Sequence, residues 1–129
     1  MRGNATTVLW VVSGLLALTF VVTGVSKVAS VPPSPENFAR WGFSPAFMMG
    51  VGAVEIVGAI GLLVPRIAPY AATVLLLTMG GALRTGLVHH ESLHIALPIA
   101  LGALLAYVIY ARRGVLLARL PSTKVRQGQ

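Results

Sequence analysis

The chain of 129 residues contains no cysteine and no aspartate, and only 10% of its residues are charged. The absence of cysteine excludes disulfides, thiolate metal ligands and CxxC redox chemistry, so any electrons must be carried by a bound cofactor or by a partner. Soluble domains carry about 25% charged residues. With 56% hydrophobic residues, this chain has too few polar side chains to cover a surface in water. It is predicted to be one compact membrane domain.

Acidic residues are scarce: Glu36, Glu55 and Glu91 stand against ten lysines and arginines, which gives a formal net charge of +7. In a soluble protein this balance would suggest nucleic acid as a partner. Here the basic residues lie mostly between and beyond apolar segments, where membrane topology and lipid headgroups explain them. The expected partner is therefore the lipid bilayer, and no nucleic acid is expected.

Four apolar segments are each long enough to cross about 30 Å of hydrocarbon at ~1.5 Å per residue. They predict an all-α, four-transmembrane-helix bundle over residues 1–111, with helices at about 5–26, 44–64, 67–88 and 92–111. A proline-containing loop joins the first two helices, and a basic tail follows at 112–129. The first segment is interpreted as a retained helix, because its apolar core is long for a signal peptide.

The basic residues are distributed unevenly between the two predicted faces of the bundle. One face holds seven of them: Arg2, Arg66, Arg112, Arg113, Arg119, Lys124 and Arg126. The other face holds two, Lys27 and Arg40. Because cytoplasmic loops are enriched in lysine and arginine, the N- and C-termini are both predicted to be cytoplasmic.

Three ionisable residues lie inside the predicted helices or at their ends. Glu55 falls near the bilayer midplane, Arg84 about one turn from the outer end of its helix, and Lys27 at the outer end of the first helix. Such groups must be paired or must face water. We predict an internal Glu55–Arg84 pair with Lys27 nearby. Two alternatives stay open: the pair only fixes helix register, and Lys27 only snorkels toward headgroups.

Residues His90-Glu91-Ser92-Leu93-His94 match the H-E-x-x-H pattern, which in zinc proteases places two imidazoles on one helical face. The match lies at the membrane edge, and no third histidine or acidic ligand follows it. No metal site is therefore predicted. His94 is the better candidate for a polar site, because Pro98 cannot donate to its carbonyl.

These considerations predict a polar pocket, in the outer half of the bundle, that binds a ligand. Its expected residues are Lys27, Glu55, Arg84 and His94. Its expected mouth comprises Arg40, Trp41, His89 and His90. Simple interface positions for His89 and His90 remain an alternative, and no catalytic residue is assigned.

Four stretches of the chain form a recognisable pattern. They are G-V-S-K at 24–27, F-A-R-W-G-F at 38–43, G-A-V-E-I-V-G-A-I-G-L-L-V-P at 52–65 and M-G-G-A at 79–82. Together they resemble the DoxX-like family of small four-helix integral membrane proteins. The resemblance covers nearly the whole chain up to the basic tail, and Lys27, Glu55 and Arg84 match polar positions of the pattern.

The resemblance implies a four-helix fold in the bacterial cytoplasmic (inner) membrane. The family takes its name from a subunit of a thiosulfate:quinone oxidoreductase, and other members look like partners of redox enzymes. A eukaryotic relative of similar pattern is a chaperone for nicotinic receptors. Because function varies within this fold, the family does not settle the chemistry.

Three functions are consistent with these features. The first is an accessory subunit that binds a small polar or quinone-type ligand and supports a membrane or redox protein, rather than a stand-alone enzyme. The second is a non-catalytic assembly, chaperone or structural subunit, with glycine-rich faces for another membrane protein or for self-association. The third is a small proton or solute conduit through Glu55 and the histidines. Quinone is the one cofactor considered.

Overall fold

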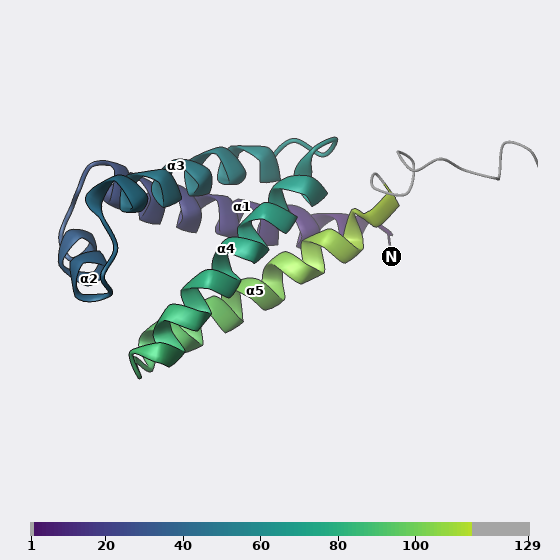
Figure 1. Ribbon diagram of the computed structural model, residues 1–129. Helices are drawn as coiled ribbons and strands as arrows, with labels where there is room; N and C mark the ends of the chain where they lie inside the picture. The colour runs from purple at the N-terminus through teal and green to yellow at the C-terminus, as the bar shows by residue number, and fades with distance from the viewer. Residues whose placement is uncertain (1, 115–129) are drawn as a thin grey trace, which may run out of the picture.

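The computed structural model describes residues 2–114, and within this range the chain forms five helices and no strand (Figure 1). The four long helices are α1 (Arg2–Val28), α3 (Pro45–Leu62), α4 (Ala68–Val88) and α5 (Leu93–Ala111). Each of them is long and apolar enough to cross a membrane. The predicted all-α fold with four spans is confirmed. The predicted tail lies outside the described residues from position 115 onward.

One short helix, α2 (Ser34–Arg40), lies between α1 and α3, in the segment that was expected to be a loop. Its first turn contains Pro35, whose missing N–H needs no partner there, and Glu36, whose charge suits a helix N-terminus. The next helix begins where the sequence predicted. The Ser44 hydroxyl accepts a hydrogen bond from the N–H of Phe47 at 3.1 Å, and Pro45 follows it.

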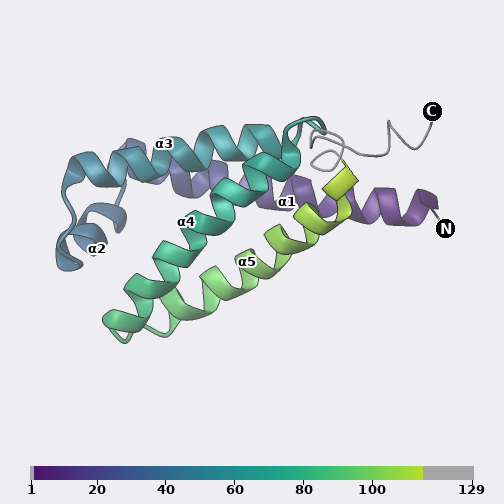
Figure 2. The same cartoon turned by 45° about the vertical axis from the view of Figure 1, so that its right-hand side comes forward.

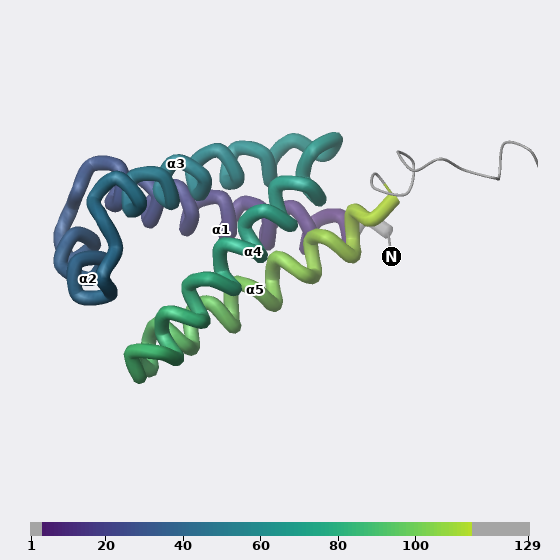
Figure 3. Tube along the Cα trace, viewed as in Figure 1, coloured from purple at the N-terminus to yellow at the C-terminus, as the bar shows by residue number. Residues whose placement is uncertain are grey.

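The long helices form two antiparallel pairs, α1 with α3 and α4 with α5 (Figures 1 and 2). The pairs meet at the end that holds the α3–α4 turn, and they diverge toward the end that holds α2 and the α4–α5 loop. The tube in Figure 3 shows the same divergence along the Cα path. We call the two ends the hairpin end and the mouth end.

Glycines set the closest approaches between neighbouring helices. A Cβ atom on Gly52 would lie 2.6 Å from the carbonyl oxygen of Gly24, and one on Gly24 would lie 2.7 Å from the oxygen of Gly52. The backbones of α1 and α3 can touch here only because neither residue has a side chain. Gly58 likewise allows α3 and α4 to approach each other. The side chain of Leu75 occupies the space that a Cβ on Gly58 would need.

The packed core lies in the hairpin half of the molecule, where all four long helices contribute to one cluster. Its buried members are Leu16, Ala17, Phe20, Ala59, Leu62, Ala72, Leu75, Met79, Leu105 and Val108. The outward faces are also apolar, with Leu18, Val57 and Leu77 largely exposed. A surface of this kind is suited to hydrocarbon rather than to water. The mouth half, which lacks this packing, contains the candidate site.

Candidate functional site

A cavity of about 740 Å³ lies between the two helix pairs in the mouth half. Its walls are mostly apolar and aromatic, and all four residues predicted for the polar pocket line it: Lys27, Glu55, Arg84 and His94. The structure therefore brings these residues to one cavity. That they bind a ligand there stays a prediction.

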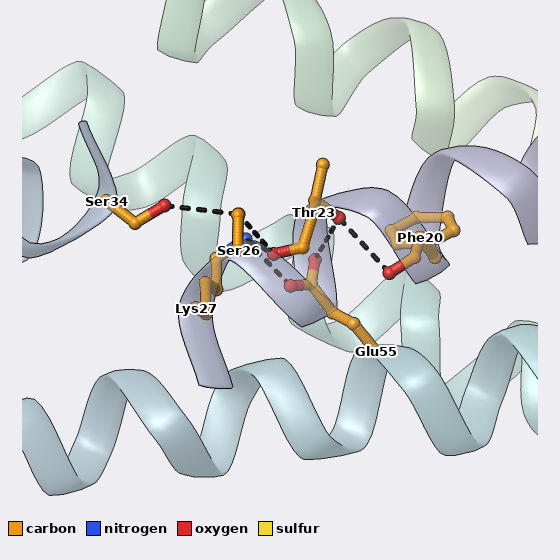
Figure 4. A network of polar contacts seen from close by, with 6 residues as sticks. All are labelled: Phe20, Thr23, Ser26, Lys27, Ser34 and Glu55. Atoms are coloured by element: carbon orange, nitrogen blue, oxygen red, sulfur yellow. Dashed lines mark hydrogen bonds and ion pairs between the residues drawn. The ribbon is translucent and has the colours of Figure 1, made fainter. Parts of the chain in front are cut away.

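The most buried polar group of the cavity is the carboxylate of Glu55, whose side chain is 3% exposed. Its Oε1 lies 2.7 Å from Lys27 Nζ, and its Oε2 accepts a hydrogen bond from Thr23 Oγ1 at 3.3 Å (Figure 4). Lys27 also donates to the carbonyl oxygen of Thr23 at 3.4 Å. The pair is thus held by hydrogen bonds from one turn of α1, as buried charges require.

The direction of helical side chains explains this pairing. Long side chains on a helix lean toward its N-terminus. Because α1 and α3 are antiparallel, Lys27 leans back toward the middle of α1 while Glu55 leans toward the mouth end, so the two side chains meet. The contact of Gly24 with Gly52 brings the backbones close enough for that meeting.

The predicted Glu55–Arg84 pair is wrong, because the ion pair of Glu55 is made with Lys27. Arg84 lies on α4, which diverges from α3 beyond the contact of Gly58 with Leu75. Its side chain is exposed and lines the cavity, without an ion pair or hydrogen bond among residues 4–114. Simple snorkelling of Lys27 is excluded as well, since its ammonium faces inward.

A chain of hydroxyl contacts ties α2 to the same site. Ser26 Oγ donates to the carbonyl oxygen of Thr23 at 2.7 Å and lies 3.2 Å from Ser34 Oγ (Figure 4). The Thr23 hydroxyl is in addition 3.4 Å from the carbonyl oxygen of Phe20. The first turn of α2 is thereby fixed beside the Lys27–Glu55 pair.

At the mouth end, a second cluster joins the two helix pairs, and we call it the mouth latch. The carboxylate of Glu91, in the α4–α5 loop, accepts hydrogen bonds from Arg40 Nη2 and Trp41 Nε1, each at 2.7 Å. His94 Nδ1 lies 3.2 Å from the same carboxylate. The hydrogen bonds from Arg40 and Trp41 lower the pKa of Glu91 from 4.5 to about 2.

Aromatic rings cover the cavity beneath the mouth latch. Phe38, buried in α2, packs 5.3 Å from Trp41 and 6.4 Å from Phe47 between ring centroids. The Trp41 ring meets the His94 ring edge-on at 4.9 Å. Such contacts are favourable aromatic geometries. The aromatic residues between positions 38 and 47 line the cavity and form a roof over it.

The four residues expected at the mouth have different positions. Trp41 lines the cavity, and Arg40 is held in the mouth latch. His89 Nδ1 donates a hydrogen bond to the carbonyl oxygen of Thr85 at 3.0 Å, and the His89 ring lies 6.5 Å from the Trp41 ring. His90 is exposed at the end of the turn, with φ of 55°, and does not line the cavity.

The H-E-x-x-H match has a different role in the structure. Its central Glu91 is bound by Arg40 and Trp41, so the carboxylate joins two helix pairs. Among the described residues, no three histidine, cysteine or acidic side chains are grouped to hold a metal ion. The structure thus places Glu91 of this motif in the mouth latch.

Sequence reasoning missed Thr23 and the role of Glu91. Thr23 had a detectable signal, since it lies four residues before Lys27 and so on the same helical face. The contact of Glu91 with Arg40 joins residues 51 apart in the chain, and no local pattern announces it.

The fold and its polar cavity define a multi-pass membrane protein with four spanning helices. A family model described as the DoxX-like family matches residues 11–108, which include most of α1 and α5 and all of the helices between them. The chain belongs to the DoxX-like family. No curated protein and no solved structure matches it.

Proposed function

We propose that this protein is an accessory membrane subunit whose cavity binds a small amphipathic molecule, a quinone among the candidates, in support of a membrane redox partner. The observation that carries the proposal is the cavity itself, which combines apolar aromatic walls with a few convergent polar groups. Ligand sites of proteins have this composition and a volume of roughly 300–1,000 Å³.

The residues present fit a quinone. Its ring needs apolar walls, which Phe43 and Phe47 would supply, and its carbonyl oxygens need donors such as the Arg84 guanidinium. A bound quinone supplies the electron-accepting chemistry that a chain without cysteine lacks. The part of this chain would be to bind and orient the molecule and to keep water from it.

The conduit function has less support from the structure. A proton or solute path must cross the whole bundle. The cavity occupies the mouth half, whereas the hairpin half holds the packed cluster around Leu16, Phe20 and Leu105. The polar groups that could relay a proton are gathered at one end.

The test is to identify what the cavity holds after purification in mild detergent, by mass spectrometry of an organic extract. The wild type should carry a stoichiometric amphipathic molecule. Ala82→Phe, which fills the cavity, should lose it. Ala103→Phe, on the exposed face of α5, is the matched control and should keep it.

Three other outcomes would overturn the proposal. A stoichiometric protein partner without a small molecule would favour the assembly function. Dissipation of a pH gradient by the protein in liposomes would favour the conduit. Equal retention of the molecule by the Ala82→Phe variant would place it outside the cavity.

A further inference from the structure

Three lysine, arginine or glutamate side chains line the cavity, and one of them has no ion pair among residues 4–114. Inside it, Lys27 neutralises Glu55. In the mouth latch, Arg40 neutralises Glu91 at 2.7 Å. Arg84 is left as a cation on the cavity wall, without an ion pair or hydrogen bond among residues 4–114.

The position of Arg84 along α4 indicates which part of a ligand would meet its charge. It lies four residues before the end of α4 at Val88, about 6 Å along the axis at ~1.5 Å per residue. With α4 spanning the hydrocarbon, this places the guanidinium near the level expected for the head of an amphiphile. A guanidinium in an otherwise apolar span needs an anion or water, and no carboxylate of the described residues is paired with it.

The cavity is open sideways, toward hydrocarbon. Phe47 on α3 and Val74 and Leu77 on α4 line it and are nevertheless 50%, 47% and 72% exposed. Because these exposed lining residues belong to α3 and α4, we place the opening between these two helices. The two helices diverge toward the mouth end (Figure 2). Toward the water, by contrast, the contact of Glu91 with Arg40 and Trp41 crosses the mouth.

Head and tail positions follow from the geometry of α4. Leu77 lies seven residues before Arg84, which is two turns and the same helical face. A molecule entering between α3 and α4 would thus place its head at Arg84 and its tail along Leu77 toward the core. Arginine binds carboxylates and phosphates through two parallel hydrogen bonds, which favours an acidic head over a neutral one.

We propose that the cavity takes an acidic amphiphile, a molecule with one carboxylate or phosphate head and an apolar tail, from the bilayer, and that Arg84 binds its head. The inference rests on the proposed function and narrows the choice of ligand. An amphiphile with an anionic head is expected to bind more tightly than a neutral quinone. A free fatty acid and an acidic phospholipid share this chemistry.

The test compares cis-parinaric acid with its methyl ester, bound to protein in nanodiscs of phosphatidylcholine at pH 8 and followed by fluorescence. The wild type should bind the acid about tenfold more tightly than the ester. Arg84→Gln should reduce acid binding about tenfold and ester binding much less, because a neutral carbonyl makes the weaker hydrogen bond with a guanidinium. Arg84→Lys should recover part of the loss, and Arg66→Gln, in the exposed turn at the hairpin end, should bind as the wild type does.

Equal binding of acid and ester, or full acid binding by Arg84→Gln, would overturn the inference. Displacement of both probes by a short-chain quinone, independent of Arg84 but abolished by Ala82→Phe, would overturn it and leave the proposed function standing. Binding of neither probe by the wild type would overturn the inference, and the co-purification experiment would then decide the proposed function separately. Competition by phosphatidylglycerol added to the nanodiscs would identify a phospholipid as the source of the acid head, and its absence a free fatty acid.

Discussion

At the scale of single residues, the stability of the mouth half depends on the Lys27–Glu55 pair. Glu55→Gln leaves the ammonium of Lys27 without its counter-ion in an apolar span, and we expect it to lower the free energy of unfolding by about 3–5 kcal/mol. The double variant Lys27→Met with Glu55→Met removes both charges and should regain most of that loss. Denaturant unfolding in a single detergent checks both values.

If the Lys27→Met, Glu55→Met double variant is as unstable as Glu55→Gln, the unpaired charge of Lys27 is not the cause of the lost stability. The loss would then come from the hydrogen bond of the Thr23 hydroxyl to Glu55 or from altered packing. Thr23→Val separates these, because it removes the hydroxyl and keeps the shape.

The mouth latch has its own dependence on pH. Since the pKa of Glu91 in the folded protein lies near 2, below the usual 4.5, its contribution is present above pH 4.5 and is lost as the pH falls through about 2. The fluorescence of Trp41 should therefore change below about pH 3 as Glu91 takes up its proton. Trp10→Phe removes the other tryptophan signal.

Glu91→Gln supplies the control, because it removes the charge that Arg40 neutralises while keeping a group that can accept from Trp41. Its Trp41 fluorescence should already differ from wild type at pH 7 and should lack the acid transition. A transition that persists in this variant would assign the pH response to another group.

The residue scale also shows where sequence reasoning fails. The depths of Glu55 and Arg84 along their helices could be estimated from residue counts, and both do line one cavity. The partner of Glu55 depends on which helices touch and on the direction in which each side chain leans. The Gly24–Gly52 contact selects Lys27, and no feature of Arg84 itself could reveal that.

At the scale of helices, the contact between α1 and α3 allows a matched test. A Cβ on Gly52 would lie 2.6 Å from the backbone oxygen of Gly24, so Gly52→Ala should force the helices apart and cost about 1–3 kcal/mol of stability. Gly50, on the same helix, has open space around it. Gly50→Ala should be neutral or stabilising by up to about 1 kcal/mol, because alanine favours helix.

Thermal unfolding of both variants in the same detergent measures the difference. Equal stability of Gly52→Ala and Gly50→Ala would contradict the close approach of the two backbones. A lower stability of Gly52→Ala together with lost retention of the co-purified molecule would link the helix contact to the cavity.

Helices of different length were predictable to different degrees. The four spans follow from apolar length alone, which needs no knowledge of packing. The seven residues of α2 are too few to show a helical period, and the prolines before it favoured a loop. Its stability comes from tertiary contacts, such as Phe38 in the aromatic roof and Ser34 beside Ser26.

At the scale of the whole molecule, the divergence of the two helix pairs could not be predicted from the sequence. The ionisable residues of the spans pointed to a polar pocket in the outer half, but they do not show where the backbones of the pairs diverge. The divergence follows from side-chain size at particular contacts, such as Gly58 against Leu75 near the hairpin end. At the mouth end the pairs are joined instead by the polar contact of Glu91 with Arg40.

The orientation in the membrane is the remaining prediction at this scale. At the mouth end, Lys27 and Arg40 are paired with carboxylates, whereas Arg66 is exposed at the hairpin end, which also holds the start of α1. Cytoplasmic faces are the basic ones, so the hairpin end is expected in the cytoplasm. The chain has no cysteine, and single cysteines can therefore report sidedness without background.

An impermeant maleimide should label Ser30→Cys, in the exposed turn after α1, in intact cells. It should label Asn4→Cys, at the other end of α1, only after the membrane is permeabilised. Labelling of Asn4→Cys alone in intact cells would invert the orientation, and the cavity would then open on the cytoplasmic side. Labelling of both positions without permeabilisation would mean that α1 does not cross the bilayer, because its two ends would share one face.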